Sequence, residues 1–351
     1  MGRRNPLTRI MMLLNKDFES DPRVTKEAES LGDAGHYVHV LDHKKGSCSS
    51  RVKWLGNTLR FWWWCLGRSR SRSFDAVHAH DLDTLPIGCL ISKLRNVPLV
   101  YDAHESYVDM IRDRIPESLE FFLRFVEHRL VRGCAKVIIA VEGLSYLVSQ
   151  HPKDCAVVMN CPQEIPLPAH KSNHPLRLGY IGSLEPGRGI MEGIEAVNKT
   201  STWGMVIAGS GSLENEVLKR ENHKVKYLGK VSQKTALQLT ALCDLHLATV
   251  SSQNANLSLG YPTRMFDAMM CGKPIVVSYF TEASRLVQEK DCGFLSDSHP
   301  LPMSYLLEYL ADNPEELTRT GENGRKAWEN QYTWAEQEKT LLSVYDSLGR
   351  D

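Results

Sequence analysis

The first half of the chain alternates short apolar runs with longer stretches in which apolar and polar positions mix. Asp21 and Pro22 mark the start of one longer stretch, because aspartate caps helices and proline is tolerated at the first helical position. Gly35 is a natural stop for this helix. The short runs predicted as strands are 10–14, 37–41, 74–78, 97–101, 137–141 and 156–159. Strands that alternate with helices in this way predict a parallel sheet covered on both faces.

The second half repeats the alternation after a stretch rich in proline. Pro162, Pro166, Pro168 and Pro175 fall within residues 160–175, a composition typical of a linker between domains. The later strands are predicted at 176–181, 204–208, 225–228, 245–248 and 274–278, with helices at 213–220 and 263–270.

This pattern predicts an α/β fold of two doubly wound, Rossmann-like domains. We place the first domain at residues 1–165 and the second at 175–334, with a C-terminal helix of about 335–351 packing back on the first. Ligands of doubly wound sheets bind outside the carboxyl ends of the strands, so a cleft between the two domains is the expected site.

Composition narrows the functional classes. Of the 351 residues 42% are hydrophobic and 24% are charged, and Lys+Arg and Asp+Glu both number 42. The resulting net charge of zero gives no argument for a nucleic-acid partner. The 9 cysteines form no CxxC pair, so we expect a reduced compartment with neither a disulfide framework nor a zinc site. No apolar run approaches the ~20 residues needed to span a bilayer, which favours a cytoplasmic protein.

The stretch from Gly260 to Ser278 carries the strongest chemical signal. It predicts a loop, a helix that Pro262 starts, a glycine stop and a strand. The free N–H groups of a helix N-terminus attract phosphate, and Arg264 in the first turn adds a charge that can grip phosphate through two bonds. Asp267 follows on the same face and can accept hydrogen bonds from both hydroxyls of a ribose. On the residues alone, an exposed Arg–Asp pair on a surface helix is an equal alternative.

Further motifs extend this signal over nearly the whole chain. They are the segments Asp21–Val24, Gly35–His36, Tyr101–Glu105, Leu178–Ser183, Gly187–Ile190, Ala208–Gly211, Tyr227–Gly229 and Cys292–Phe294. Their order and spacing resemble those of the family 4 glycosyltransferases, which have the GT-B architecture of two Rossmann-like domains. In that family a glutamate before a small residue holds the ribose, and Asp267 before Ala268 stands at this position.

The resemblance implies roles for residues in both domains. His104, which follows the predicted strand 97–101, would contact the transferred sugar. Arg188 and Arg264 would hold the diphosphate. The residues that would lie at or near the nucleotide are Gly182, Ser183, Gly209, Gly229, Val231, Thr263 and Asp267. The alternative for His104 is a histidine that only hydrogen-bonds a loop, and for the glycines it is ordinary turn structure.

His78, His80 and Asp81 come after another predicted strand and should lie at the same sheet edge as His104. Ordinary hydrogen-bonding side chains are the favoured interpretation. We do not expect these histidines to bind zinc, because nothing else nearby has ligand spacing.

Three departures from the family pattern bear on the mechanism. Leu259 stands where the family has a first acidic residue, Ser183 stands where it has a basic one, and Asn15–Asp17 replaces its glycine-rich turn. The nucleotide-binding scheme survives these changes, whereas the handling of sugar and acceptor no longer follows from the family. Two other interpretations therefore stay open: a nucleotide-sugar epimerase of the same architecture, and a nucleotide-sugar-binding protein without catalytic activity.

The resulting hypothesis is a glycosyltransferase that moves a sugar from a nucleoside-diphosphate sugar to a glycan or lipid-linked acceptor. Arg188, Arg264 and the helix N-terminus at Thr263 would stabilise the leaving diphosphate without a metal ion. No cofactor other than the donor is expected, and the resemblance implies retention of anomeric configuration.

The stretch Arg51–Arg72 suggests where a lipid-linked acceptor would be met. It contains six Lys and Arg residues and five Trp and Phe residues, and it has no acidic residue. Cations beside aromatic rings suit a lipid headgroup interface, so we predict a peripheral membrane contact on the inner face of the membrane. The alternative, slightly favoured, is a helix whose tryptophans pack on the sheet and whose arginines are solvated.

Overall fold

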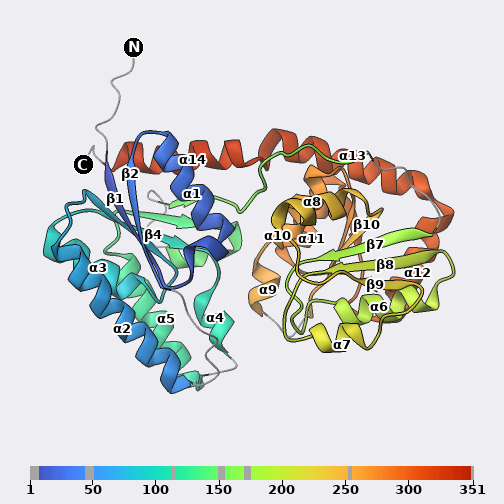
Figure 1. Cartoon of the computed structure of the whole chain (residues 1–351), viewed down its shortest axis with the longest axis horizontal. Coiled ribbons are helices and arrows are strands. Elements are labelled where there is room, and N and C mark those ends of the chain that lie inside the picture. The colour runs from blue at the N-terminus through green and yellow to red at the C-terminus, as the bar shows by residue number, and fades with distance from the viewer. Residues whose placement is uncertain are drawn as a thin grey trace, which may run out of the picture. The chain divides into compact units, whose positions relative to one another are not determined.

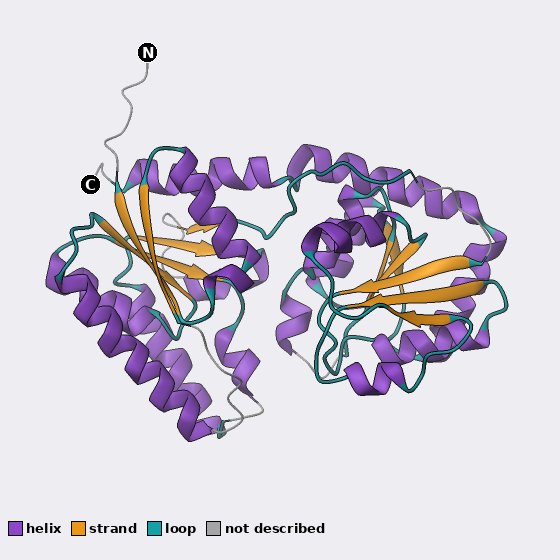
Figure 2. Cartoon of the chain, viewed as in Figure 1, coloured by secondary structure: helices purple, strands orange, loops and turns teal. Residues whose placement is uncertain are grey.

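The structure is a computed structural model that describes residues 8–43, 51–112, 115–148, 155–169, 175–251 and 255–348. At 51–55, 148 and 255–256 it describes the backbone only. The chain folds into two units, Met1–Asn160 with Ala335–Asp351, and Cys161–Trp334. Each unit contains one six-stranded sheet with helices on both of its faces (Figure 2). The chain therefore passes from one unit to the other twice, after Asn160 and after Trp334.

The first sheet has the order β2-β1-β3-β4-β5-β6, and every recorded pair is parallel. Its central strands are buried because helices cover both faces. The strands are β1 (Arg9–Leu14), β2 (Tyr37–Asp42), β3 (Ala76–His80), β4 (Leu99–Ala103), β5 (Lys136–Ile139) and β6 (Cys155–Val157). The order reverses between β1 and β3, and ligands of doubly wound sheets bind at such a point.

The helices of the first unit form two layers (Figure 1). Helices α2, α3 and α5 lie side by side on one face of the sheet, and α3 contacts both of the others. The Asp21 side chain caps α1 by accepting hydrogen bonds from the N–H groups of Arg23 and Val24, which confirms the predicted helix start. The helices are α1 (Pro22–Asp33), α2 (Arg51–Arg70), α3 (Leu85–Arg95), α4 (Tyr107–Ile111), α5 (Glu117–Val131) and α14 (Trp334–Ser347), with 3-10 turns η1 (Phe18–Ser20) and η3 (Glu142–Val148).

The second sheet has the order β12-β11-β10-β7-β8-β9 and is also parallel in every recorded pair. Its order reverses between β7 and β10. The strands are β7 (Leu176–Ile181), β8 (Trp203–Ala208), β9 (Val225–Tyr227), β10 (Leu245–Ala248), β11 (Ile275–Val277) and β12 (Gly293–Leu295). With the first sheet, this confirms the predicted fold of two doubly wound α/β sheets.

Helices pack on both faces of the second sheet around a buried core. The fully buried Trp203 ties β8 to α12, because its indole N–H donates to the Leu307 carbonyl at 2.7 Å. The helices are α6 (Ile190–Lys199), α7 (Glu214–Leu218), α8 (Gln233–Ala241), α9 (Ala255–Leu259), α10 (Thr263–Met270), α11 (Glu282–Lys290), α12 (Pro300–Asp312) and α13 (Pro314–Gln331).

Two strands of the first sheet begin later than predicted. The expected strand 74–78 is Ala76–His80, and the expected strand 97–101 is Leu99–Ala103. Each strand therefore extends two residues beyond its predicted end. Polar side chains occupy buried positions there. The short β12 was not predicted, because a run of three residues is too short to show a strand pattern.

Candidate active site

His104 lies at the carboxyl edge of the first sheet, directly after β4. Its Nε2 is 3.3 Å from Oδ2 of Asp102, and its Nδ1 is 3.7 Å from Oδ2 of Asp81. Nε2 also lies 3.1 Å from Nδ1 of His80. The backbone N–H of His104 donates to Oδ1 of Asp81 at 3.1 Å. Only 9% of the side chain is exposed, so the ring is held in place by these contacts.

The two carboxylates set the charge of His104. Burial lowers the pKa of its imidazole, but Asp81 and Asp102 outweigh burial and raise the pKa to about 9. Burial and the neighbouring His78 lower the pKa of His80 to about 3. At neutral pH His104 is therefore a cation beside a neutral His80. A protonated imidazole has two N–H donors and no acceptor, so it can bind a sugar or phosphate oxygen but cannot act as a base.

A buried ion-pair network stands behind His104. Arg23 of α1 donates from Nη2 to Oδ1 of Asp102 at 2.8 Å and from Nη1 to the Val158 carbonyl at 2.7 Å. Its Nε lies 2.9 Å from Oε1 of Glu27. Although burial opposes it, Arg23 and His104 hold the pKa of the Asp102 carboxyl well below its usual range. Asp102 therefore links a permanent cation in α1 to the charged imidazole at the sheet edge.

His78 and His80 lie inside β3, so the prediction that placed them after the strand is wrong. Both rings are fully buried and stack with their centroids 4.2 Å apart. Nδ1 of His78 is 2.6 Å from the hydroxyl of Tyr345 in α14. Only Asp81 follows the strand, where it adopts a positive φ of 61°.

Glu27, His78, His80 and Asp102 each bring one potential ligand atom to within 4.8 Å of the others, a grouping that could hold a metal ion. The guanidinium of Arg23 already contacts both carboxylates, and it would repel a second cation. We therefore interpret the four residues as part of a charge-compensated network. That the reaction needs no metal stays a prediction.

The turn that replaces the glycine-rich one brings another cation to this edge. Nζ of Lys16 lies 3.4 Å from Oδ2 of Asp21 and 3.5 Å from Oδ2 of Asp81. Asn15 donates to Oδ2 of Asp83 at 2.8 Å. The turn that departs from the family pattern is thus fixed by side-chain contacts.

Arg264 is the central cation of the second unit. It lies in the first turn of α10 and is only 7% exposed. Its Nε donates to the Leu247 carbonyl at 3.0 Å, its Nη1 donates to the Tyr180 hydroxyl at 3.4 Å, and its Cζ lies 4.6 Å from the centre of the Tyr180 ring. Among the described residues, none accepts a hydrogen bond from its buried Nη2. Burial lowers the pKa of this guanidinium, and the nearby Arg188 acts in the same direction.

The loops after β7, β8 and β9 meet beside Arg264. The N–H of Gly182 donates to the Ala208 carbonyl at 2.9 Å, and that of Gly209 donates to the Gly229 carbonyl at 2.8 Å. A Cβ on Gly182 would lie 3.6 Å from Nη1 of Arg264. Gly209 has a φ of 141°, and a Cβ there would overlap the Gly182 carbonyl oxygen. Only glycine at 209 lets these two strand ends approach so closely.

The other predicted nucleotide residues take up positions around this centre. Asp267 is half-buried one turn beyond Arg264 and contributes to its electrostatics. Thr263 is exposed at the start of α10, and Arg188 is half-buried in the turn before α6. Ser183 is exposed, and its carbonyl accepts from the Tyr180 hydroxyl at 2.7 Å. Val231 is half-buried two residues after Gly229.

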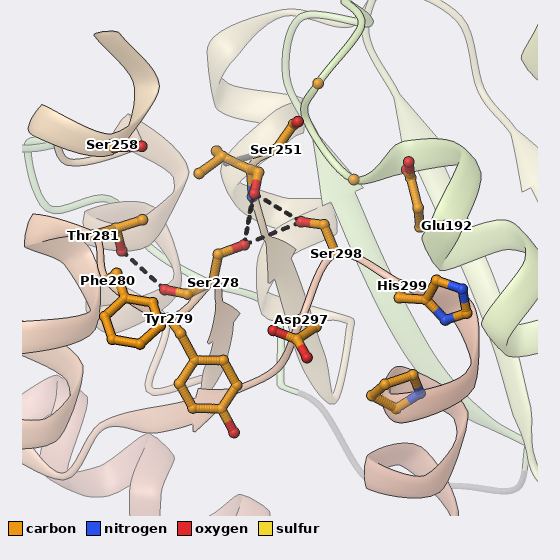
Figure 3. A pocket seen from close by; sticks show the side chains of 14 residues that line it. Glu192, Ser251, Ser258, Ser278, Tyr279, Phe280, Thr281, Asp297, Ser298 and His299 are labelled. Carbon is orange, nitrogen blue, oxygen red and sulfur yellow. Dashed lines mark hydrogen bonds between the residues drawn. The ribbon is translucent and has the colours of Figure 1, made fainter. Parts of the chain in front are cut away.

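A pocket of about 590 Å³ opens at the carboxyl ends of β10, β11 and β12 (Figure 3). Its polar lining includes Glu192, Ser251, Ser278, Thr281, Asp297 and His299, and its aromatic lining is Tyr279 and Phe280. The Ser278 hydroxyl accepts from the Val250 N–H at 2.9 Å and so joins the ends of β10 and β11. None of the residues predicted for the site lines this pocket, although Arg188 stands between the lining glycines 187 and 189.

Sequence reasoning missed the charged partners of the site residues. Arg23 and Asp102 both fall within motifs that carried the resemblance, but only His104 was singled out there. The overlooked signal is a pair of opposite charges, Arg23 and Glu27, four residues apart on a helix. From sequence alone such a pair is interpreted as an ordinary exposed ion pair. The structure shows that both side chains are buried.

Comparison with known proteins bears on what this arrangement does. Residues 166–327, which lie within the second unit, match the family described as glycosyl transferases group 1. A comparison with curated proteins finds no match. Solved structures, by contrast, match over nearly the whole chain.

HepE of Anabaena, solved in complex with UDP, is 16% identical with a TM-score of 0.71, and the match covers 97% of this chain and 100% of HepE. Sucrose-phosphate synthase from Thermosynechococcus elongatus is 13% identical with a TM-score of 0.75 over 97% of this chain and 99% of that one. WaaG, a glycosyltransferase involved in lipopolysaccharide biosynthesis, is 14% identical with a TM-score of 0.68 over 95% of this chain and 99% of WaaG. At these identities the likeness concerns the fold.

The fold and the family match together define the class: the protein is a glycosyltransferase of the GT-B architecture. More particularly, residues 166–327 of its second unit match the group 1 glycosyl transferases.

Proposed function

We propose that the second unit binds a nucleoside-diphosphate sugar and that the protein transfers this sugar to an acceptor hydroxyl. The observation that carries the proposal is the environment of Arg264, a buried guanidinium whose Nη2 has no acceptor in the described part of the chain and which lies near a second cation, Arg188. A diphosphate would satisfy the open Nη2 and offset the repulsion between the two cations. HepE of Anabaena, which has the same fold, is solved with UDP and with UDP-glucose, and this supports the choice of donor.

The same cations would assist the chemical step. As the bond from the sugar to the diphosphate breaks, negative charge grows on the diphosphate oxygens. Arg188, Arg264 and the N-terminus of α10 at Thr263 would stabilise that charge, so the proposed reaction needs no metal ion. Following the family resemblance, a phosphate oxygen takes the proton of the acceptor hydroxyl and the sugar keeps its anomeric configuration.

The proposal is tested by offering a panel of nucleotide sugars to the protein. A ligand that binds only the folded state raises the melting temperature, which identifies the donor. Release of nucleoside diphosphate that depends on an added acceptor then demonstrates transfer. An epimerase would instead convert its donor with no acceptor present, and a binding protein without activity would be stabilised by donor but release no diphosphate.

Asp267→Ala is expected to weaken donor binding more than folding. Loss of hydrogen bonds from a ribose to a carboxylate costs about 1.5–3 kcal/mol, or roughly tenfold to a hundredfold in affinity. Isothermal titration with the identified donor measures the change. Glu216→Ala, which removes an exposed carboxylate from α7 of the same unit, is the matched control and should bind like the wild type. An affinity that Asp267→Ala leaves unchanged would take this residue out of the ribose site.

His104→Gln is expected to change how stability depends on pH. The pKa of His104 is raised to about 9 in the folded protein, above the ordinary value of about 6.5. Its charged form therefore stabilises the fold fully below about pH 6.5, and this contribution is lost as pH rises through about 9. Chemical unfolding across this range measures the effect, and the difference between wild type and variant should shrink as pH rises. Parallel curves would show that folding does not raise the pKa of His104, and a difference that grows with pH would show that the fold keeps it neutral.

His104→Gln also tests whether His104 acts on the transferred sugar or on the nucleotide. We propose that it orients the transferred sugar, so turnover should fall while affinity for free nucleoside diphosphate stays near that of the wild type. An equal loss of nucleotide affinity would contradict this role.

For the acceptor we propose a glycan or a lipid-linked molecule that the protein meets at a membrane surface. Within the described residues no helix is long and apolar enough to cross a bilayer, so such contact would be peripheral. The aromatic residues of Arg51–Arg72 differ in how far they are buried. Phe61 is buried, and the indole N–H of Trp62 donates to the Asp83 carbonyl at 2.7 Å. The side chains of Arg51, Lys53 and Trp54 lie outside the described residues.

A further inference from the structure

Helix α5 exposes three phenylalanines, which sequence analysis did not single out. Phe121, Phe122 and Phe125 are 76%, 56% and 60% exposed, and Leu119 beside them is 40% exposed. Their spacing places them on one side of the helix. Contiguous apolar surface of this kind is uncommon on soluble monomers and marks an interaction site.

The neighbouring helices extend this surface. Leu90 and Leu94, one turn apart on α3, are 44% and 62% exposed, and Trp63 and Trp64 on α2 are 73% and 39% exposed. Helix α3 contacts both α2 and α5, and all three cover the same face of the first sheet (Figure 1). We call the outer surface of these helices, with the exposed residues of 56–72, 85–96 and 117–132, the three-helix face.

The charge of the three-helix face is strongly one-sided. On α2 and the turn after it the exposed basic residues are Arg60, Arg68, Arg70 and Arg72. On α3 and α5, with the residues that directly follow, they are Lys93, Arg95, Arg129 and Arg132. The exposed acidic residue of these three segments is Glu117. A protein of zero net charge therefore concentrates cations on one face.

We propose that the three-helix face docks the protein on a bilayer that contains anionic lipid. Rings and leucines enter the boundary between headgroups and acyl chains, while arginines remain among the lipid phosphates. The Cζ of Arg68 lies 5.8 Å from the centre of the Trp64 ring, which shows a cation and a ring already adjacent on this face. A nucleic acid would attract the same cations, but it offers no apolar medium for Leu90, Leu94 and Leu119.

Docking through the three-helix face makes a bilayer the partner of the first unit and specifies the residues of the proposed membrane contact. It does not depend on the identity of the donor. It also adds residues to that contact, because α5 and α3 supply most of the exposed aliphatic and phenyl surface.

Co-sedimentation of the whole protein with vesicles tests the proposal. The probes are vesicles of phosphatidylcholine with phosphatidylglycerol and vesicles of phosphatidylcholine alone, each at low and high salt. Two triple variants are compared with the wild type: Arg68→Ser, Arg70→Ser and Arg72→Ser together, and Phe121→Ser, Phe122→Ser and Phe125→Ser together. The matched controls in the second unit are Lys199→Ser, Lys226→Ser and Lys234→Ser for charge, and Leu301→Ser, Tyr305→Ser and Tyr309→Ser for apolar surface. All six control positions are exposed.

The wild type is expected to sediment with the anionic vesicles and to bind less at high salt, because salt screens the attraction of cations to lipid phosphate. The arginine variant should lose binding at least about tenfold at low salt. The phenylalanine variant should lose it at both salt concentrations, because apolar insertion is not screened. Both controls should bind like the wild type.

A wild type that does not bind anionic vesicles would overturn the proposal. So would self-association that the phenylalanine variant abolishes while vesicle binding is absent, because the face would then be an interface between copies. Binding of RNA by the wild type in place of vesicles would have the same consequence. Nucleotide affinity, measured on every variant, keeps the two proposals apart: docking can fail with nucleotide binding intact, and nucleotide binding can fail with docking intact.

Discussion

Arg264→Ala is expected to lower the affinity for nucleoside diphosphate by roughly a hundredfold or more, since charge-assisted hydrogen bonds contribute about 1.5–3 kcal/mol each. Its Nη2, for which the described residues offer no acceptor, and the neighbouring Arg188 make this guanidinium a strong candidate to hold a diphosphate. Isothermal titration with the nucleoside diphosphate of the identified donor measures the loss.

Three further variants separate binding from folding. Arg264→Lys keeps the charge but loses the planar fork, so its affinity should lie between those of alanine and wild type. Arg188→Ala removes the second cation from a half-buried turn without touching the packing of α10, and it should also weaken binding. Arg285→Ala is the control, because this side chain is 79% exposed and pairs with Glu282 on the surface of α11. Full affinity in both Arg264→Ala and Arg188→Ala would reject the proposed diphosphate site.

Arg23→Met is expected to destabilise the first unit by about 3–5 kcal/mol, the usual effect of leaving one charge of a buried pair without its partner. Arg23 reaches Asp102, Glu27 and the Val158 carbonyl through three different nitrogens, and its side chain is only 4% exposed. Methionine fills similar volume but provides no donor, so the Asp102 charge would remain buried without its main compensation. Unfolding by denaturant, followed by two spectroscopic probes, measures the loss.

The control for this variant is an ion pair on the surface of the same unit. Arg9 and Asp75 lie 2.7 Å apart between Nη2 and Oδ1, with side chains 48% and 41% exposed. Arg9→Met should therefore cost less than about 1 kcal/mol. If Arg23→Met costs no more than Arg9→Met, the buried network does not stabilise the unit as we infer.

The fold could be predicted from sequence where apolar runs and turn residues agree. Strands β7 and β10 and helix α10 have the predicted ends, and Asp21 caps α1 as expected. In each case the local pattern and the tertiary environment favour the same structure, because the strand interiors are apolar and the caps are polar. The pattern failed at β3, where histidines occupy fully buried positions.

The site could be predicted only in part for the same reason. Arg264 and His104 were found because each follows a recognisable motif, but their roles still await the experiments above. Asp102 was missed because a buried charge is recognised by its partners, and its partner Arg23 comes from a segment far away in the sequence. Arg23 and Asp102 are separated by 79 residues. The pocket beyond β11 was missed because it is built from short loop residues such as Ser278 and Thr281, whose types carry no chemical signal on their own.

The second passage of the chain between the units has a consequence for the order of synthesis. Tyr345 of α14 reaches the ring of His78 across a sequence separation of 267 residues. During translation the whole of Cys161–Trp334 is synthesised before this hydroxyl is made, so the nested unit has all of its residues first. The first-made strands must wait for one of the last-made helices, and until then the buried histidines of β3 lack a native neighbour. The first unit therefore has its full set of residues only after the second unit has its own, although the first unit begins earlier along the chain.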